Sequence, residues 1–184
     1  MLEKIIDLDK KLFVLLNGMG SDTYDMLWLI ITKQLYWTPL FLIVFYLFQK
    51  KLGWKNFIYY ILFMAVLILI CDQSANFFKD HFQRLRPCND PEIKDIIRIV
   101  KTSFSKSFFS GHATNSMATC VFTYLILKQH YKHMYLLFLF PLIFAYSRIY
   151  LGLHFPTDIL TGYAFGAIFG YMFFKIYQKY IIKN

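Results

Sequence analysis

Residues 147–158 read SRIYLGLHFPTD and place Arg148, His154 and Asp158 in an otherwise apolar C-terminal third. Pro156 suits the first turn of a helix, so we expect His154 and Asp158 about one helical turn apart at that helix start. A carboxylate at this spacing can hold one imidazole N–H, which fixes the tautomer and makes the other ring nitrogen a better nucleophile. Arg148 adds a planar cation suited to phosphate or carboxylate. A loop between two membrane helices with interfacial charges is the alternative interpretation.

The composition predicts an integral membrane protein. Of the 184 residues, 58% are hydrophobic and 21% aromatic, and only 17% are charged, against about a quarter in soluble domains. We therefore expect a single all-α, membrane-embedded domain over residues 1–184. The net charge of +9 does not indicate a nucleic-acid partner, because the basic residues are sorted by topology. The three cysteines lack metal-ligand spacing and are expected to be free thiols.

Five apolar segments are expected to cross the membrane as helices of one bundle. They cover residues 35–48, 54–78, 110–127, 134–150 and 157–177.

The N-terminal region, residues 1–33, contains an amphipathic helix over 2–16 and a short second helix around 24–32. The first of these helices lies on a membrane surface or against the bundle, and a sixth crossing within 2–32 is an open alternative. In the fourth span, Pro141 predicts a kink. In the fifth, glycines at 162, 166 and 170 predict a close packing face, within the chain rather than in a dimer.

The distribution of lysines predicts the orientation. Segments 49–56, 128–133 and 175–184 contain eight lysines and no acidic residue. The positive-inside rule makes these segments cytoplasmic, so the polar loop 79–109 and the turn 150–157 face outward.

This topology brings three polar groups to one membrane face. They are Lys79 with Arg86, then Ser110-Gly111-His112 at the start of the third span, and Arg148 with His154 and Asp158. Three cations, a helix N-terminus and two histidines suit phosphoryl transfer, where neutralising and positioning the phosphate dominate. Because no carboxylate cluster is available to hold magnesium, we expect a metal-independent reaction without a cofactor.

These residues form Lys79-x6-Arg86-Pro87, Ser110-Gly111-His112 and Ser147-Arg148-x5-His154-x3-Asp158. The set resembles the three signature motifs of the type 2 phosphatidic acid phosphatase superfamily, which includes membrane lipid phosphatases and is related to vanadium haloperoxidases. One mild departure is Phe109, where the family often has proline.

The resemblance implies a role for each residue. His154 would attack phosphorus and form a phosphohistidine, Asp158 would orient His154, and His112 would protonate the leaving group. The phosphate oxygens would be bound by Lys79, Arg86, Ser110, Gly111 and Arg148.

Other polar residues carry weaker predictions. Asp72 pairs with a cation of the site or makes a helix–helix hydrogen bond. For His81, Arg84 and Arg98, we favour a solvated loop over contact with a lipid head group.

We expect a lipid phosphate or diphosphate phosphatase at the outer face of a bacterial-type cytoplasmic membrane. Undecaprenyl diphosphate is favoured, because its extra phosphate would meet Arg84 or Arg98. Phosphatidylglycerol phosphate, phosphatidate and lipid A are the alternatives, and a non-catalytic anion transporter is the rival of another class. The oligomeric state is left open.

Overall fold

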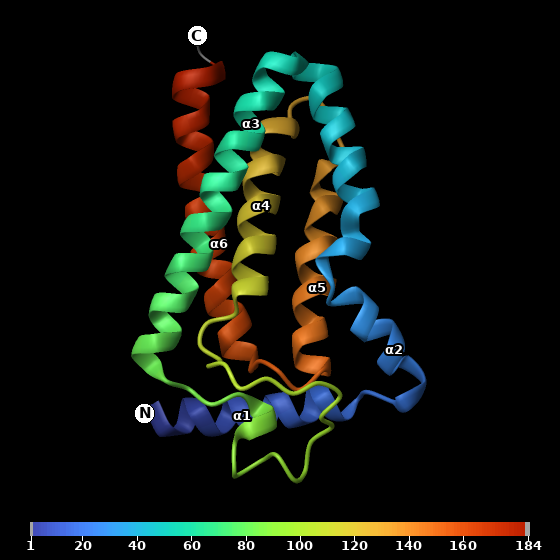
Figure 1. The fold of residues 1–184 in the computed structure, drawn as a ribbon, viewed down its shortest axis with the longest axis vertical. Coiled ribbons are helices and arrows are strands. Elements are labelled where there is room, and N and C mark those ends of the chain that lie inside the picture. The colour runs from blue at the N-terminus through green and yellow to red at the C-terminus, as the bar shows by residue number, and fades with distance from the viewer. Residues whose placement is uncertain (1, 183–184) are drawn as a thin grey trace.

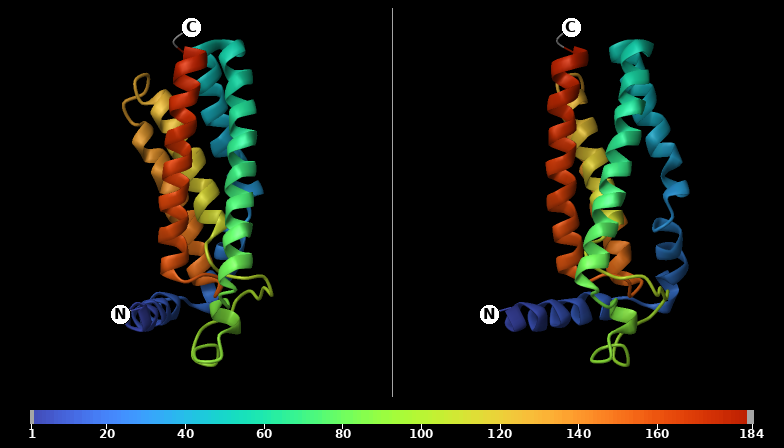
Figure 2. Two further views of the ribbon diagram at one scale, coloured as in Figure 1. Left: turned by 90° about the vertical axis from the view of Figure 1, so that its left-hand side faces the viewer. Right: turned by 60° about the vertical axis from the view of Figure 1, so that its left-hand side comes forward.

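The computed structural model describes residues 2–182, which form helices and loops without a strand. A helical bundle is crossed at one end by α1 and flanked by α2 (Figures 1 and 2). The α-helices are α1 (Leu2–Gly18), α2 (Asp22–Ile31), α3 (Thr38–Phe82), α4 (Gly111–Leu127), α5 (Leu139–Tyr150) and α6 (Pro156–Tyr177). Short turns of 3-10 helix cover Gln34–Trp37, Pro87–Asn89 and Met134–Phe138, and a π-helical turn covers Gln178–Ile182.

Helix α3 is a hairpin of two arms. Gly53 adopts φ 77° and ψ 170°, a conformation that other residues rarely tolerate, and it interrupts the helix there. The arms, 38–52 and 54–82, run in opposite directions (Figure 1). The turn lies at the end of the bundle away from α1.

The predicted spans correspond in position to the two arms of α3, to α4, to the 3-10 turn Met134–Phe138 with α5, and to α6. Among the described residues, two segments are long and apolar enough to cross a membrane, Gln34–Asn89, which contains both arms of α3, and Pro156–Ile181. The number of crossings therefore stays a prediction. Pro141 lies in the first turn of α5, directly after the 3-10 turn, so the change of helix type falls next to the proline and the kink itself stays a prediction.

The amphipathic helix α1 does not cross beside the bundle but lies roughly perpendicular to it (Figure 2). Asp9, Phe13 and Asn17, four residues apart, are buried against the bundle. Leu8 and Leu15 on other faces are 66% and 65% exposed. The two locations predicted for this helix, on a membrane surface and against the bundle, are thus compatible. One face of α1 packs on the bundle while apolar side chains on its other faces remain available to a membrane surface.

Close packing of α4 on α6 positions the two helix starts. A Cβ added at Gly170 would lie 2.6 Å from the carbonyl oxygen of Ala118, and one at Gly166 would collide with that of Thr114. The glycine face is therefore used within the chain, as predicted. The Ser110 N–H also donates to the Asp158 carbonyl at 3.1 Å, which ties the first turn of α4 to that of α6.

Candidate active site

His154 lies in the turn between α5 and α6 and is 1% exposed. The turn is shaped by Gly152, at φ 84°, and by the Arg148 carbonyl, which accepts from the N–H groups of Leu153 and His154. Pro156 opens α6, and the Asp158 carboxylate accepts from the Phe155 N–H at 2.9 Å, capping the helix N-terminus. The local sequence thus presents His154 and Asp158 to each other.

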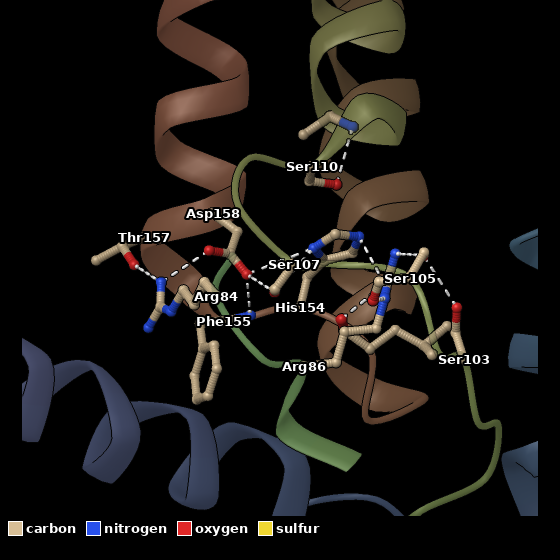
Figure 3. Close-up of polar contacts among 12 residues, drawn as sticks. Arg84, Arg86, Ser103, Ser105, Ser107, Ser110, His154, Phe155, Thr157 and Asp158 are labelled. Atoms are coloured by element: carbon tan, nitrogen blue, oxygen red, sulfur yellow. Dashed lines mark hydrogen bonds and ion pairs between the residues drawn. The ribbon is translucent and has the colours of Figure 1, made fainter. Parts of the chain in front are cut away.

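The contacts of the His154 ring define its tautomer. Nδ1 lies 3.4 Å from Asp158 Oδ2, and Nε2 lies 3.0 Å from Arg86 Nη1 (Figure 3). A guanidinium can only donate hydrogen bonds, so Nε2 accepts and the ring proton resides on Nδ1. The Nε2 lone pair is therefore directed at the cation-rich side of the site.

The surroundings of His154 favour its neutral form. Burial lowers its pKa to about 3, and the nearby charges of Arg86 and Arg148 act in the same direction, against the opposing effect of Asp158. At physiological pH the imidazole is consequently unprotonated at Nε2 and keeps the lone pair that a nucleophile requires.

Arg86 is held on several sides. Its Nε donates to the Ser105 carbonyl at 2.8 Å and Nη2 donates to Ser105 Oγ at 2.9 Å. Its Nη1 donates to the Leu153 carbonyl at 2.8 Å as well as to His154. This framework fixes the guanidinium plane beside the candidate nucleophile (Figure 3).

Arg148 has a hydrogen-bonding group available. Its Nη1 donates to Thr32 Oγ1 at 2.7 Å, whereas its buried Nε has no partner among the described residues. Arg148, Lys79 and Arg86 lie within electrostatic reach of one another. A cluster of three cations with a spare donor is a suitable site for an anion, although Asp72 and Asp158 oppose part of its charge.

The start of α4 completes the site. Ser110 is its N-cap residue, with Oγ accepting from the Ala113 N–H, and Gly111 follows at the helix N-terminus. A Cβ at Gly111 would lie 4.0 Å from Lys79 Nζ, so the absent side chain leaves room beside this ammonium. The His112 ring stacks on Phe144 with centroids 5.2 Å apart and is within electrostatic reach of His154.

A cleft of about 480 Å³ is lined by Lys79, Gly111 and His112, three of the eight predicted site residues, and its lining does not include the buried His154. A larger cavity of about 650 Å³ lies between α1, the end of α3 and the outer loop. Its lining includes Arg84 and Thr157 but none of the eight predicted site residues. We therefore place the candidate site in the smaller cleft.

Arg84 is a site residue that sequence reasoning missed. Its Nη1 donates to Asp158 Oδ1 at 2.7 Å and its Nη2 to Asp9 Oδ2 at 2.6 Å. Its guanidinium also lies 4.0 Å from the centroid of the Phe155 ring. The prediction of a solvated Arg84 is wrong, because the left-handed conformation of Gln83 (φ 49°) ends α3 and the chain then turns toward α6.

Ser107 was also missed. Its hydroxyl donates to Asp158 Oδ2 and lies 3.4 Å from His154 Nδ1 (Figure 3). The path of the outer loop brings Ser107 to Asp158 and His154, and no spacing in the sequence predicts this position.

Arg98 lies away from the site and has a partly exposed side chain, in keeping with the favoured solvated loop. It forms ion pairs with Asp22 and Asp25 of α2, at 2.6 and 3.0 Å. His81 has an exposed side chain, as favoured. Asp72 accepts a helix–helix hydrogen bond from Asn115 Nδ2 at 2.7 Å, one of its two predicted roles.

Comparisons with known proteins agree with this geometry. A family model described as the PAP2 superfamily matches residues 56–182. A lipid A 4'-phosphatase from Porphyromonas gingivalis is 33% identical over 180 residues, covering 96% of this chain and 75% of that protein. A lipid A 4'-phosphatase from Bacteroides thetaiotaomicron is 31% identical over 184 residues, covering 97% of this chain and 81% of that protein.

The fold also occurs in a solved structure. The transmembrane PAP2-type phosphatidylglycerolphosphate phosphatase from Bacillus subtilis superposes with a TM-score of 0.74 at 19% identity, covering 96% of this chain and 88% of that one. The fold, the site and these relatives define a hydrolase of phosphate esters with membrane character. The chain belongs to the PAP2 superfamily. This assignment favours the enzyme over the rival transporter.

Proposed function

We propose that the protein removes phosphate from a lipid phosphate monoester through a phosphohistidine on His154. One observation carries the proposal: a neutral His154 directs its Nε2 lone pair at a cation cluster while Asp158 and Ser107 surround Nδ1. In the structure an Arg86 N–H donates to that lone pair. A bound phosphate would take over this N–H and release the nitrogen for attack.

The first step forms the bond between Nε2 and phosphorus and breaks the bond between phosphorus and the leaving oxygen. His112 donates its proton to that oxygen as the alcohol leaves. In the second step His112 accepts a proton from water, which attacks phosphorus and releases inorganic phosphate and free His154. Asp158 stabilises the positive charge that develops on the imidazole during the first step.

Phosphate binding rests on the surrounding donors. Lys79, Arg86 and Arg148 neutralise the phosphate oxygens, and the N–H groups at the start of α4 add the favourable end of a helix dipole. Ser110 caps this helix, and Gly111 leaves the space that the phosphate needs. All of these ligands are supplied by the protein, so the reaction proceeds without a metal.

The preferred substrate is a phosphorylated glycolipid of the lipid A type. The two curated relatives described above are lipid A 4'-phosphatases and match nearly the whole chain. The argument for undecaprenyl diphosphate relied on Arg84 or Arg98, and both are engaged by protein carboxylates. A phosphatidylglycerol phosphate remains the second candidate, because the Bacillus subtilis structure has the same fold.

The direct experiment measures phosphate release by purified protein from lipid A, phosphatidylglycerol phosphate and undecaprenyl diphosphate in one detergent. We expect lipid A to be the best substrate, vanadate to inhibit and EDTA to have no effect. His154→Ala should lose about four or more orders of magnitude in turnover. Turnover near the wild-type level in this variant would contradict the proposed nucleophile.

A further inference from the structure

The cleft at the active site continues between the arms of α3. Beyond Lys79 and His112 it reaches Gln34, Asp72 and Asn115, which also line an adjoining cavity of about 210 Å³. A third cavity, of about 150 Å³, shares Phe41, Ile68, Thr119 and Phe140 with the second. Shared lining residues therefore connect the phosphate site through a polar region to an apolar one.

The polar region contains a carboxylate in an apolar helix. Asp72 precedes Lys79 by seven residues, or about 10 Å along α3 at 1.5 Å per residue. An ionisable side chain within a membrane helix is costly and commonly marks a functional site. Asp72 is exposed in the cleft and within electrostatic reach of Lys79, and because its charge repels a phosphate it suits another portion of the substrate better.

Asp72 and Asn115 together present hydrogen-bond acceptors. Asn115 Nδ2 donates to Asp72 Oδ1 at 2.7 Å, and this leaves Asn115 Oδ1 buried without a partner among the described residues. A carboxylate also has more lone pairs than one hydrogen bond uses. The two side chains consequently favour a ligand that carries O–H or N–H donors.

On the basis of the proposed phosphatase function, we propose that Asp72 and Asn115 form a head-group subsite. The subsite accepts hydrogen bonds from hydroxyl or amide groups that lie between the scissile phosphate and the hydrocarbon chain. An acylated amino sugar has such groups, whereas a polyprenyl phosphate joins its phosphate directly to the hydrocarbon. The apolar cavities beyond the subsite receive an acyl chain of the same substrate.

The test compares two substrates in the same detergent, lipid A and undecaprenyl diphosphate. Asp72→Leu removes the acceptors at similar size, and Asp80→Leu, on an exposed part of the same helix, is the matched control. We expect Asp72→Leu to lower kcat/KM for lipid A about 10- to 100-fold, the usual cost of a lost charged hydrogen bond. Its kcat/KM for the polyprenyl substrate should not fall, and Asp80→Leu should change neither value.

Asp72→Asn keeps one acceptor and should retain an intermediate rate on lipid A. Equal losses on both substrates, or no loss on lipid A, would overturn the subsite. Thermal unfolding of each variant separates these outcomes from misfolding. If the proposed phosphatase function is wrong, the wild-type protein will release phosphate from neither lipid. The subsite proposal would then fail with it.

Discussion

The bridge made by Arg84 should stabilise the whole fold. This guanidinium joins Asp9 on α1 to Asp158 on α6, and the two carboxylate side chains are 2% and 0% exposed. Replacing Arg84 with methionine keeps an unbranched side chain but leaves two buried carboxylates without their cation. Breaking a buried pair in this way costs about 3–5 kcal/mol.

The lower end of that range applies here, because both carboxylates keep other hydrogen bonds. Asp158 retains the Phe155 N–H and Ser107, and Asp9 retains the N–H of Thr157 at 2.9 Å. A loss of about 3 kcal/mol in a chain of this length corresponds to about 6–12 °C in Tm. We expect thermal unfolding of Arg84→Met in detergent to show this decrease.

The chain offers a matched control in Arg98. This residue also bridges two carboxylates and lies over a tyrosine ring, but its partner Asp22 has a fully exposed side chain and Asp25 one that is 26% exposed. Exposed pairs contribute about 0–1 kcal/mol, so Arg98→Met should lower Tm by less than about 4 °C. If Arg84→Met unfolds within about 2 °C of wild type, or no earlier than Arg98→Met, the assigned role of the buried bridge is wrong.

Three other predictions concern protonation, packing and sidedness. His154 has its pKa lowered from 6.5 to about 3, so the unfolded state binds more protons than the folded state between these values. Stability should therefore fall as pH drops from about 6.5 toward 3, and the fall should be smaller in His154→Gln; equal pH dependence in unfolding titrations would contradict this. Gly166→Ala should cost about 1–3 kcal/mol, seen as a lower Tm, because the new methyl group meets the Thr114 carbonyl on α4; an unchanged Tm would show that the helices can separate freely. The native cysteines are all buried, so a cysteine at Phe104, which is 95% exposed, should react with an impermeant thiol reagent in intact cells, and one at Gln129 only after permeabilisation. Labelling in the reverse pattern would invert the proposed orientation.

The helix positions could be predicted from the sequence because apolar periodicity and capping residues are local signals. The start of α4 at Gly111 and of α6 at Pro156 follow directly from Ser110 and from the proline. The closeness of His154 and Asp158 follows from the same helix geometry. These parts depend on neighbours within a few residues, where the chain has few alternatives.

The long-range contacts that hold the site residues in place could not be predicted from a single sequence. Asp9 and Arg84 are 75 residues apart, and Ser107 and Asp158 are 51 apart. Their meeting depends on how α1 crosses the bundle and on the left-handed turn at Gln83. A positive φ at a glutamine is rare and has no sequence signature, so the direction of Arg84 could not be foreseen.

The contact between α4 and α6 has a consequence for variation in this protein. Helix α4, which carries the candidate acid His112, and helix α6, which directly follows the candidate nucleophile His154, are spaced by closely approaching peptide groups, which are the same whatever the side chains. Outward residues of α6 such as Leu160 and Ile168, 63% and 54% exposed, take no part in that spacing. Residues on the outer surface can consequently be substituted to suit a bilayer of another composition, or water. The geometry of the reacting groups stays unchanged as long as the small residues between α4 and α6 are kept.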